Sequence, residues 1–524
     1  GGVSLSLDFK KILIANRGEI AIRVMRAANE MGKRTVAVYA EEDKLCLHRF
    51  KADEAYHIGE GLGPVAAYLS IDEIIRVAKM SGSDAVHPGY GLLSENPDLV
   101  DACVAAGLTF VGPSADTMRK LGDKASARKV AISAAVPVVP ATDVLPENIE
   151  EISELASKIG YPLMLKASWG GGGRGMRPVL DENELSSKIL EGRREAQSAF
   201  GNDEGYLEKL IQSARHVEVQ ILGDKFGTTF HLWERDCSVQ RRNQKVVERA
   251  PAPYLDDAQR EELCGYAKAI CAKVGYYCAG TVEFLMDIDT EQFFFIEVNP
   301  RVQVEHTVTE EITGIDIVKA QFLLAAGAKI GDNFCGVPNQ KDIHIKGHAI
   351  QSRVTTEDAA NDFAPDYGKI SVYRSASGLG IRLDAGTAAT GTVITPYYDS
   401  LLVKVTAKGQ TPLEATKRMD RALREFRVRG VKTNIPFLLK LMNHDCFESF
   451  QYHTKYIDSA KDLFTFSSRK DRATKVLSFL AEVIVNGNPE VSNRPKLRET
   501  IPAKLSDYGI ARSIKAQSSS GKTY

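Results

Sequence analysis

Over the first 120 residues, short apolar runs alternate with longer segments whose apolar residues recur every three or four positions. The run KILIA at 11–15 predicts a buried strand, and the spacing over 19–31 predicts a helix with one apolar face. Further apolar runs at 34–40 and 107–112 flank a helix pattern at 71–82. This rhythm is typical of a parallel sheet covered by helices, so we expect an α/β unit. The turn after the first strand lacks the GxGxxG fingerprint of dinucleotide-binding folds.

The pattern changes after residue 123. Several strands with little intervening helix are predicted over 206–300, and short strands with glycine-rich turns over 343–430. This organisation favours an α+β arrangement with mostly antiparallel strands. Polar and charged residues dominate from about 455, with one helix pattern at 472–485. We therefore expect a multidomain protein of combined α/β and α+β class.

Composition narrows the choice of partners. The 67 Lys and Arg residues balance the 68 Asp and Glu residues, giving a formal net charge of -1. A general basic surface for nucleic acid is therefore not expected, and any anion must be held by a local site. The chain contains no run of apolar residues long enough to span a membrane. Its eight cysteines form no CxxC pair, which argues against a structural zinc site or a disulfide framework.

Four consecutive glycines are the most unusual local feature: Gly170, Gly171, Gly172 and Gly173. Such a run is entropically costly unless the backbone must approach a ligand closely with its N–H groups. The flanking residues predict strands on both sides, unlike the strand–loop–helix of a P-loop. Lys166 on the preceding strand offers a point charge to phosphate. We interpret the loop as a hairpin that closes over a polyphosphate; a plain flexible turn is the alternative.

The segment 281–306 predicts a hairpin with acidic residues on one face. In such a hairpin Glu283 lies opposite Glu297, and Asn299 shares the face of Glu297 because side chains alternate along a strand. Facing carboxylates destabilise a hairpin unless a cation neutralises them, and oxygen ligands suit Mg²⁺ or Mn²⁺. A solvated polar face is the alternative. The polar residues that crowd the strand end, from Arg301 to His306, favour a site.

The segment 234–253 concentrates positive charge beside a predicted strand, with Arg241, Arg242 and Lys245. A nucleic-acid patch is the alternative to an anion pocket, but the segment lacks the interleaved aromatic residues that stack on bases. We therefore expect an anion pocket. The polar loop at 87–96 is placed to line the same cleft.

Taken together, these segments resemble the biotin carboxylase component of biotin-dependent carboxylases, within the ATP-grasp superfamily. The matching motifs, in the family's order, are KILIANRGEIA (11–21), HPGYGLLSEN (87–96), GGGGRGM (170–176), RDCSVQRRNQK (235–245), EVNPRVQVEH (297–306), GHAIQSR (347–353) and YYDSLLVK (397–404). GGGG alone is a weak signal, but the set is very specific. The stretch 462–490 is further similar to the residues that follow this component in pyruvate carboxylases.

The resemblance implies a fold and its boundaries. An N-terminal Rossmann-like domain over 8–122 would precede an ATP-grasp domain over 123–340, whose mobile, glycine-rich lid lies at about 137–205. A β-rich biotin carboxylase C-terminal domain would cover 343–455. Residues 456–524 would be a linker and tail, partly helical and disordered at the end.

The resemblance also implies a reaction: MgATP-dependent carboxylation of biotin by bicarbonate through carboxyphosphate. Glu305 would be the base on bicarbonate, with Arg301, Lys245 and Arg353 as further catalytic residues. The implied ATP-binding residues are Lys124, Lys166, Gly170, Gly171, Gly172, Gly173, Glu208, Lys209, Leu210, His216, Gln240 and Asn243. The implied metal ligands, for two Mg²⁺ or Mn²⁺ ions, are Glu283, Glu297 and Asn299. Bicarbonate and biotin would be bound by Lys245, Arg301, Gln303, Val304, Arg353 and Asp399.

Some features depart from the family pattern or leave alternatives open. Asn243 stands where many relatives carry His, which puts its nucleotide contact in question. The sequence lacks the AMKM biotinylation motif, so we expect biotin as a substrate, supplied free or on a biotinyl carrier domain, beside a carboxyltransferase partner. A homodimer in the cytoplasm is expected, with the mitochondrial matrix as the alternative compartment. The alternatives in function are the biotin carboxylase of an acyl-CoA carboxylase, a different ATP-grasp ligase, and an ATP-binding module without catalysis.

Overall fold

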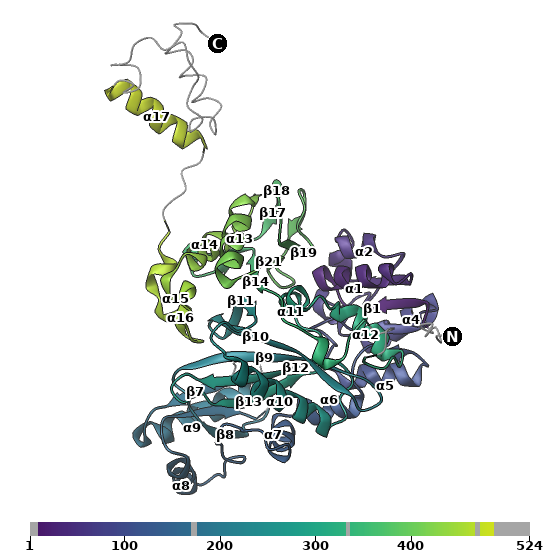
Figure 1. The fold of residues 1–524 in the computed structure, drawn as a ribbon, viewed down its shortest axis with the longest axis vertical. Coiled ribbons are helices and arrows are strands. Elements are labelled where there is room, and N and C mark those ends of the chain that lie inside the picture. Colours follow the sequence, from purple (N-terminus) through teal and green to yellow (C-terminus); the bar gives the residue numbers. More distant parts are fainter. Residues whose placement is uncertain (1–8, 169–174, 332–335, 467–471, 487–524) are drawn as a thin grey trace. The chain divides into compact units, whose positions relative to one another are not determined.

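The computed structural model describes residues 9–168, 175–331, 336–466 and 472–486. Contacts divide the chain into two compact units, Gly1–Phe464 and Thr465–Tyr524. Helix α17 (Arg472–Asn486) lies in the second unit. All elements named below lie in the first unit, and Figure 1 labels many of them. The finer boundaries expected inside the first unit stay predictions.

The N-terminal part contains the predicted parallel sheet. Its five strands lie side by side in the order β3-β2-β1-β4-β5, and every pair is parallel. The strands are β1 Lys11–Ile14, β2 Arg34–Tyr39, β3 Glu54–His57, β4 Ala85–His87 and β5 Thr109–Phe110. The helices are α1 Gly18–Glu30, α2 Leu47–Lys51, α3 Pro64–Tyr68, α4 Ile71–Ser81, α5 Pro97–Ala105 and α6 Ala115–Gly122. The α/β prediction for this part is confirmed.

Periodicity explains most of these elements. In α1 the apolar residues Ile20, Val24 and Ala27 recur at helical spacing and are buried in one core cluster with Ile14 of β1. The sequence pattern did not predict strand β3, because its four residues are all half-buried and include no apolar run. Such an edge strand gives little periodic signal.

A second, smaller sheet follows. Its three strands lie in the order β7-β6-β8 with antiparallel pairing. They are β6 Leu163–Ala167, β7 Met176–Val179 and β8 Gly205–Lys209. The helices here are α7 Lys124–Ser133, α8 Ile149–Ile159 and α9 Glu182–Phe200. Residues 169–174, including the predicted phosphate loop Gly170, Gly171, Gly172 and Gly173, lie outside the described residues.

The largest sheet has eight strands in the order β13-β12-β9-β10-β11-β14-β21-β19. The strands are β9 Ala214–Gly223, β10 Thr229–Arg241, β11 Gln244–Ala250, β12 Cys278–Asp287, β13 Phe293–Asn299, β14 His348–Thr355, β19 Ile381–Ala385 and β21 Leu401–Gly409. All neighbouring pairs are antiparallel, as the sequence predicts. The β11–β14 pair continues the sheet from the segment expected to be ATP-grasp into the segment expected to be the C-terminal domain.

Further elements complete the first unit. The remaining α-helices are α10 Asp257–Lys273, α11 His306–Thr313, α12 Ile317–Ala325, α13 Pro412–Glu425, α14 Ile435–Met442, α15 Asp445–Glu448 and α16 Tyr456–Ser459. The short strands are β15 Glu357–Asp358, β16 Ala364–Pro365, β17 Gly368–Lys369, β18 Val372–Arg374, β20 Val393–Ile394 and β22 Arg427–Arg429. Among the described residues, no helix combines the length and apolarity that crossing a bilayer requires.

The two faces of the central strands differ in chemistry. On one face Val217, Val219 and Phe284 form a core with Leu263 and Ala267 of α10. Because side chains alternate along a strand, their polar neighbours are placed on the opposite face. The buried polar residues of β9 and β12 are Glu218, Gln220, Thr281 and Glu283. The sheet thus presents a buried, charged face, and the candidate site is built on it.

Candidate active site

Four charged residues on four neighbouring strands lie opposite one another in register. Glu297 on β13 lies opposite Glu283 on β12, which confirms the register predicted for this hairpin. Glu283 in turn lies opposite Glu218 on β9, and Glu218 lies opposite Arg235 on β10. Burial and the neighbouring Glu283 carboxylate raise the pKa of Glu297 to about 8. Without a further cation, Glu283 and Glu297 therefore favour sharing one proton over carrying two negative charges.

Lys245 lies at the centre of the acidic cluster. Its ammonium donates to Glu218 Oε2 at 3.0 Å, Glu283 Oε1 at 2.8 Å and Glu305 Oε1 at 2.8 Å. Burial lowers the pKa of Lys245, but these three carboxylates outweigh burial and raise it well above its usual value. The ammonium thus joins a residue of the expected metal site, Glu283, to the expected base, Glu305.

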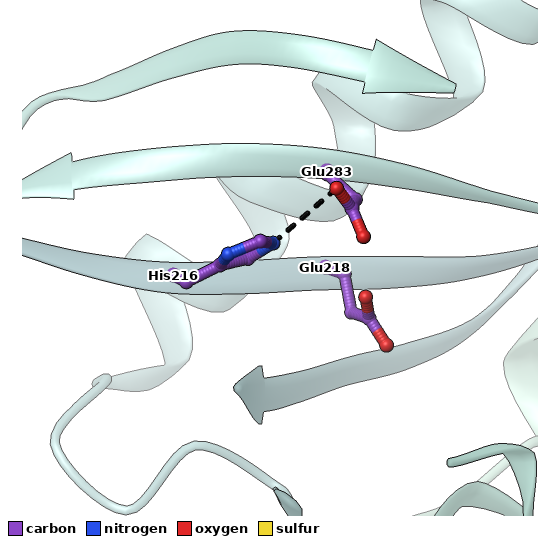
Figure 2. Close-up of side chains that lie close together, drawn as sticks. All are labelled: His216, Glu218 and Glu283. Atoms are coloured by element: carbon purple, nitrogen blue, oxygen red, sulfur yellow. Dashed lines mark ion pairs between the residues drawn. The ribbon is translucent and has the colours of Figure 1, made fainter. Parts of the chain in front are cut away.

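His216, Glu218 and Glu283 lie close together on the same face of the sheet, as Figure 2 shows. The Nε2 atom of His216 is 3.4 Å from Glu283 Oε2. Its Nδ1 atom is 3.0 Å from the amide nitrogen of Gln240, which can only donate, so Nδ1 accepts and Nε2 carries the ring proton. Lys245 contacts both carboxylates and Arg235 pairs with Glu218, so the protein itself supplies positive charge to this trio.

Glu305 and Arg353 form the other end of the cluster. Arg353 Nη2 lies 3.0 Å from Glu305 Oε2, and its Nε donates to Glu248 Oε1 at 2.6 Å. Burial raises the pKa of Glu305, but the charges of Lys245 and Arg353 outweigh burial and hold it well below its usual value. Glu305 is therefore a carboxylate at neutral pH.

Arg235, which the sequence did not predict as a site residue, holds two members of the cluster in place. It is fully buried, and its Nε donates to Glu218 Oε1 at 2.6 Å. One Nη2 hydrogen bond, at 2.9 Å, fixes the amide oxygen of Gln303, whose Nε2 atom lies 3.3 Å from Glu283 Oε1. Glu218 and Glu248 were also missed. The sequence held a signal for Glu218, because polar residues alternate with valine in HVEVQ at 216–220.

Lysines mark the end of the site expected to hold ATP. Lys166 Nζ lies 2.7 Å from Glu208 Oε1 on the neighbouring strand of the small sheet. Burial lowers the pKa of Lys124, which begins α7. Lys209 is different, because its ammonium donates to the carbonyl oxygens of Gly160 and Tyr161 at 3.0 and 2.8 Å.

Arg301 and Asp399 come from loops around the site. Arg301 Nε lies 3.3 Å from Glu95 Oε2, so the motif at 87–96 does reach the same cleft, as expected. Asp399 Oδ1 accepts from the backbone N–H of Leu401 at 2.8 Å, which fixes the loop before β21.

Most of the predicted site residues line one cavity of about 1410 Å³, whereas Glu218, Arg235 and Glu248 lie behind its wall and are not among the lining residues. The predicted site residues that line it are Lys124, Lys166, Glu208, Leu210, His216, Gln240, Asn243, Lys245, Glu283, Glu297, Asn299, Arg301, Gln303, Val304, Glu305, Arg353 and Asp399. Lys209 is not among the lining residues, and the four glycines lie outside the described residues. A single cavity with a lysine-bearing end and a carboxylate cluster can hold a phosphorylated nucleotide beside a small anion.

Comparison with known proteins adds independent information. Three family models match successive segments: the biotin carboxylase N-terminal domain over 8–118, the ATP-binding domain of the carbamoyl-phosphate synthase L chain over 123–333, and the biotin carboxylase C-terminal domain over 351–459. Pyruvate carboxylase of Bacillus subtilis is 51% identical over 93% of this chain, and the mitochondrial pyruvate carboxylase of Mus musculus is 54% identical over 91%. The chain spans only 42% and 40% of those two relatives.

Solved structures give the same result. Rhizobium etli pyruvate carboxylase with the allosteric activator acetyl coenzyme A matches with a TM-score of 0.85 and 62% identity, covering 94% of this chain and 44% of that one. The biotin carboxylase domain dimer of Hydrogenobacter thermophilus 2-oxoglutarate carboxylase, in complex with MgADP, ADP and bicarbonate, matches with a TM-score of 0.83 and 43% identity. That match covers 88% of this chain and 99% of the domain. The chain therefore belongs to the biotin carboxylase family of ATP-grasp enzymes.

Proposed function

We propose that the protein carboxylates biotin, using bicarbonate and MgATP, as the first half-reaction of a biotin-dependent carboxylase. One observation carries the proposal. The Lys245 ammonium contacts Glu283 and Glu305 at 2.8 Å each, so the groups expected to bind metal and to deprotonate bicarbonate meet at one cation. The lysines expected to bind phosphate line the same cavity.

The nucleotide is assigned to the lysine-bearing end. Lys124 and Lys166 would bind its phosphates, and Lys166 would exchange its present partner, Glu208, for an oxygen of the polyphosphate. The backbone at Glu208–Leu210 is the proposed edge for adenine, with His216, Gln240 and Asn243 nearby along the cavity wall. Gly170, Gly171, Gly172 and Gly173 are the proposed covering loop. Lys209 is the weakest member of this set, because its ammonium donates to the carbonyl oxygens of Gly160 and Tyr161.

Glu283, Glu297 and Asn299 suit divalent cations, with Mg²⁺ proposed first and Mn²⁺ as a substitute. The fit rests on the facing carboxylates of Glu283 and Glu297, because burial and the neighbouring Glu283 carboxylate raise the pKa of Glu297 to about 8, as expected for a pair that a further cation would stabilise. Carboxylate and amide oxygens are the ligands that these hard cations prefer. Two such cations would neutralise charge on the phosphate oxygens while the γ-phosphoryl group is transferred to bicarbonate.

The anion end would carry out the proton transfers. Lys245, Arg301, Gln303 and the backbone of Val304 would hold bicarbonate, and Glu305 would take its proton. The bicarbonate oxygen then attacks the γ-phosphorus, the bond to ADP breaks, and carboxyphosphate forms. Carboxyphosphate splits into CO₂ and phosphate; phosphate takes the N1′ proton of biotin, and N1′ attacks CO₂. Arg353 would stabilise the negative charge on the ureido oxygen of biotin, with Asp399 beside it.

The wider setting is also proposed. The curated relatives named above are pyruvate carboxylases, which supports pyruvate as the final acceptor. The chain spans less than half of them, so a carboxyltransferase and a biotinyl carrier domain are the proposed partners. A homodimer is proposed because the 2-oxoglutarate carboxylase domain is described as a dimer. The cytoplasm is the proposed compartment, with the mitochondrial matrix as the alternative that the murine relative supports.

The test is ADP release by the purified protein with MgATP, first without and then with bicarbonate, and finally with free biotin added. The proposal requires ADP release that depends on bicarbonate and rises with biotin, together with formation of carboxybiotin from labelled bicarbonate. Nucleotide binding without turnover would instead indicate a non-catalytic module. ADP release that needs an amine and not bicarbonate would indicate a different ATP-grasp ligase.

A further inference from the structure

A second charged group lies behind the anion end, and the proposed roles leave it unexplained. Lys404 on β21 is fully buried, and its ammonium donates to the carbonyl oxygen of Val304 at 2.8 Å. The same ammonium lies 3.1 Å from Glu19 Oε1 on α1. Across the sheet, Lys404 lies between Arg353 on β14 and Asp384 on β19. A lysine without exposure to water is rare unless its charge is paired, so this position is specifically built.

Glu19 connects this lysine to the wall of the cavity. It is buried in the first turn of α1 and accepts a hydrogen bond from the hydroxyl of Tyr90. Tyr90 itself lines the cavity, as do Arg353 and Asp399. Glu19, Tyr90 and Lys404 come from the motifs NRGEI, HPGYG and YYDSLLVK, which are far apart in sequence. None of the three has a role in the chemistry proposed above.

The contact with Val304 has a specific consequence. Helix α11 begins at His306, and Glu305 is its N-cap residue. The carbonyl of Val304, a half-buried residue, precedes the helix and has no place in its hydrogen-bond ladder, so its donor must come from outside the helix. The Lys404 ammonium is that donor. It therefore fixes the backbone immediately before Glu305, whose side chain must meet Lys245 and Arg353.

We infer that Lys404, held by Glu19, to which Tyr90 donates a hydrogen bond, is a positioning residue that sets the Val304–Glu305 backbone for bicarbonate. The inference deepens the proposed function and rests on it. Lys404 acts through the peptide at Val304, and it neither contacts bicarbonate nor transfers a proton.

Two variants separate positioning from general stability. Lys404→Met removes the donor but leaves Glu19 buried without its cation, so the variant is destabilised. The double variant Lys404→Met/Glu19→Gln restores charge balance and keeps a partner for Tyr90, while the Val304 carbonyl still lacks its donor. The matched control is Arg260→Met with Arg260→Met/Glu234→Gln. This second buried ion pair joins α10 to β10, with Arg260 Nε 3.0 Å from Glu234 Oε2, and neither residue contacts Val304 among the hydrogen bonds of the described residues.

The measurements are the KM for bicarbonate and for ATP, the thermal midpoint, and hydrogen exchange of a peptide covering 301–308. We expect both Lys404 variants to raise the KM for bicarbonate by about tenfold or more, the factor for one hydrogen bond to a charged group. The KM for ATP should stay within about twofold, since Lys404 makes no contact at the nucleotide end. The 301–308 peptide should exchange faster in the double variant than in the Arg260 pair.

Recovery of the wild-type bicarbonate KM in the double variant, together with its thermal midpoint, would show that Lys404 is only structural. Unchanged exchange of the 301–308 peptide would overturn the inference as well. If the unsubstituted protein shows no bicarbonate-dependent ADP release, the proposed function fails. The exchange comparison then decides by itself whether Lys404 holds this backbone.

Discussion

The two cations beside Glu305 have opposite effects on its proposed role as a base. A carboxylate held by Lys245 and Arg353 is ionised at neutral pH, so it is ready to accept a proton. The same two cations make it a weak base, because they stabilise its charged form. Bicarbonate resolves the conflict if it takes up part of the positive charge now facing Glu305. The basicity of Glu305 would then rise only when its substrate is present.

Replacing Glu305 by Gln tests the base at the residue that carries it. Glutamine keeps the shape and one acceptor oxygen, but it cannot take a proton from bicarbonate. We expect bicarbonate-dependent ADP release to fall by about a hundredfold or more, as for the loss of a general base. The Kd for ATP should not change, since Glu305 lies at the anion end. The exposed Glu262→Gln on α10 is the control, and equal rates for both variants would refute the assignment.

Residues that line the cavity were easier to predict than the buried residues behind them. Glu283, Glu297 and Lys245 stand out because charges gather at the ends of apolar strands. Arg235 and Glu248 give no such signal, since each stands beside other charged residues of its strand, and its burial depends on neighbours distant in sequence. Arg235 bonds to Thr309 at 2.9 Å, a residue 74 positions away. Only folding brings these groups together.

At the scale of elements, hairpins were predictable because their partners are close in sequence. The β12–β13 register follows from alternation and a short connection, so Glu283 and Glu297 could be paired in advance. The β11–β14 pair could not, because about a hundred residues separate its strands and many registers satisfy the same alternation. That pair brings Arg353 of β14 to Glu248 of β11. Local pattern therefore predicted the facing carboxylates and an anion pocket with Lys245, whereas the roles of Glu305 and Arg353 came from the resemblance alone.

The turn between β10 and β11 allows a test of Asn243. Arg242 and Asn243 form its two central residues with φ of 48° and 63°, the left-handed pair of a type I′ hairpin. Asparagine and glycine tolerate this conformation, whereas a β-branched residue pays about 1–2 kcal/mol. We expect Asn243→Val to lower the free energy of unfolding by that amount, and Asn243→Gly to change it little.

The Asn243→Gly variant also decides whether the side chain binds nucleotide. It keeps the turn and removes the amide, so a raised KM for ATP would support the proposed contact. An unchanged KM for ATP, with unchanged urea unfolding, would assign Asn243 to the turn alone. Loss of stability in the glycine variant would contradict the I′ interpretation.

For the first unit as a whole, one cavity depends on segments from its entire length. Glu95 meets Arg301, and Glu19 meets Lys404, over separations of 206 and 385 residues (301 − 95 and 404 − 19). The motifs near the N-terminus therefore serve a site whose charged residues lie mostly after residue 200. This explains why periodicity alone predicted the layers of the fold but not the closure of the site. A substitution that destabilises the N-terminal sheet should therefore also disturb the anion end, through the Glu95–Arg301 and Glu19–Lys404 contacts.

His87, at the end of β4, makes the stability of the first unit depend on pH. It is fully buried, with Nε2 2.9 Å from Gln321 Oε1 on α12, and Nδ1 accepts from the N–H of Gly89 at 3.0 Å. Both ring nitrogens are thus satisfied in the neutral form, and burial lowers the pKa of His87 to about 4. Unfolding restores the ordinary value of about 6.5, so the unfolded chain binds the proton between these limits.

The stabilising contribution of neutral His87 is therefore complete above pH 6.5 and is lost as the pH falls towards 4. Between pH 7 and pH 5 the loss is about 2 kcal/mol by linkage. Urea unfolding at these two pH values should show a smaller difference for His87→Asn, which keeps an acceptor for Gly89 but cannot be protonated. The exposed His344→Asn is the control. An equal pH dependence for His87→Asn and the unsubstituted protein would mean that His87 takes up its proton in the folded state, against the geometry of its two hydrogen bonds.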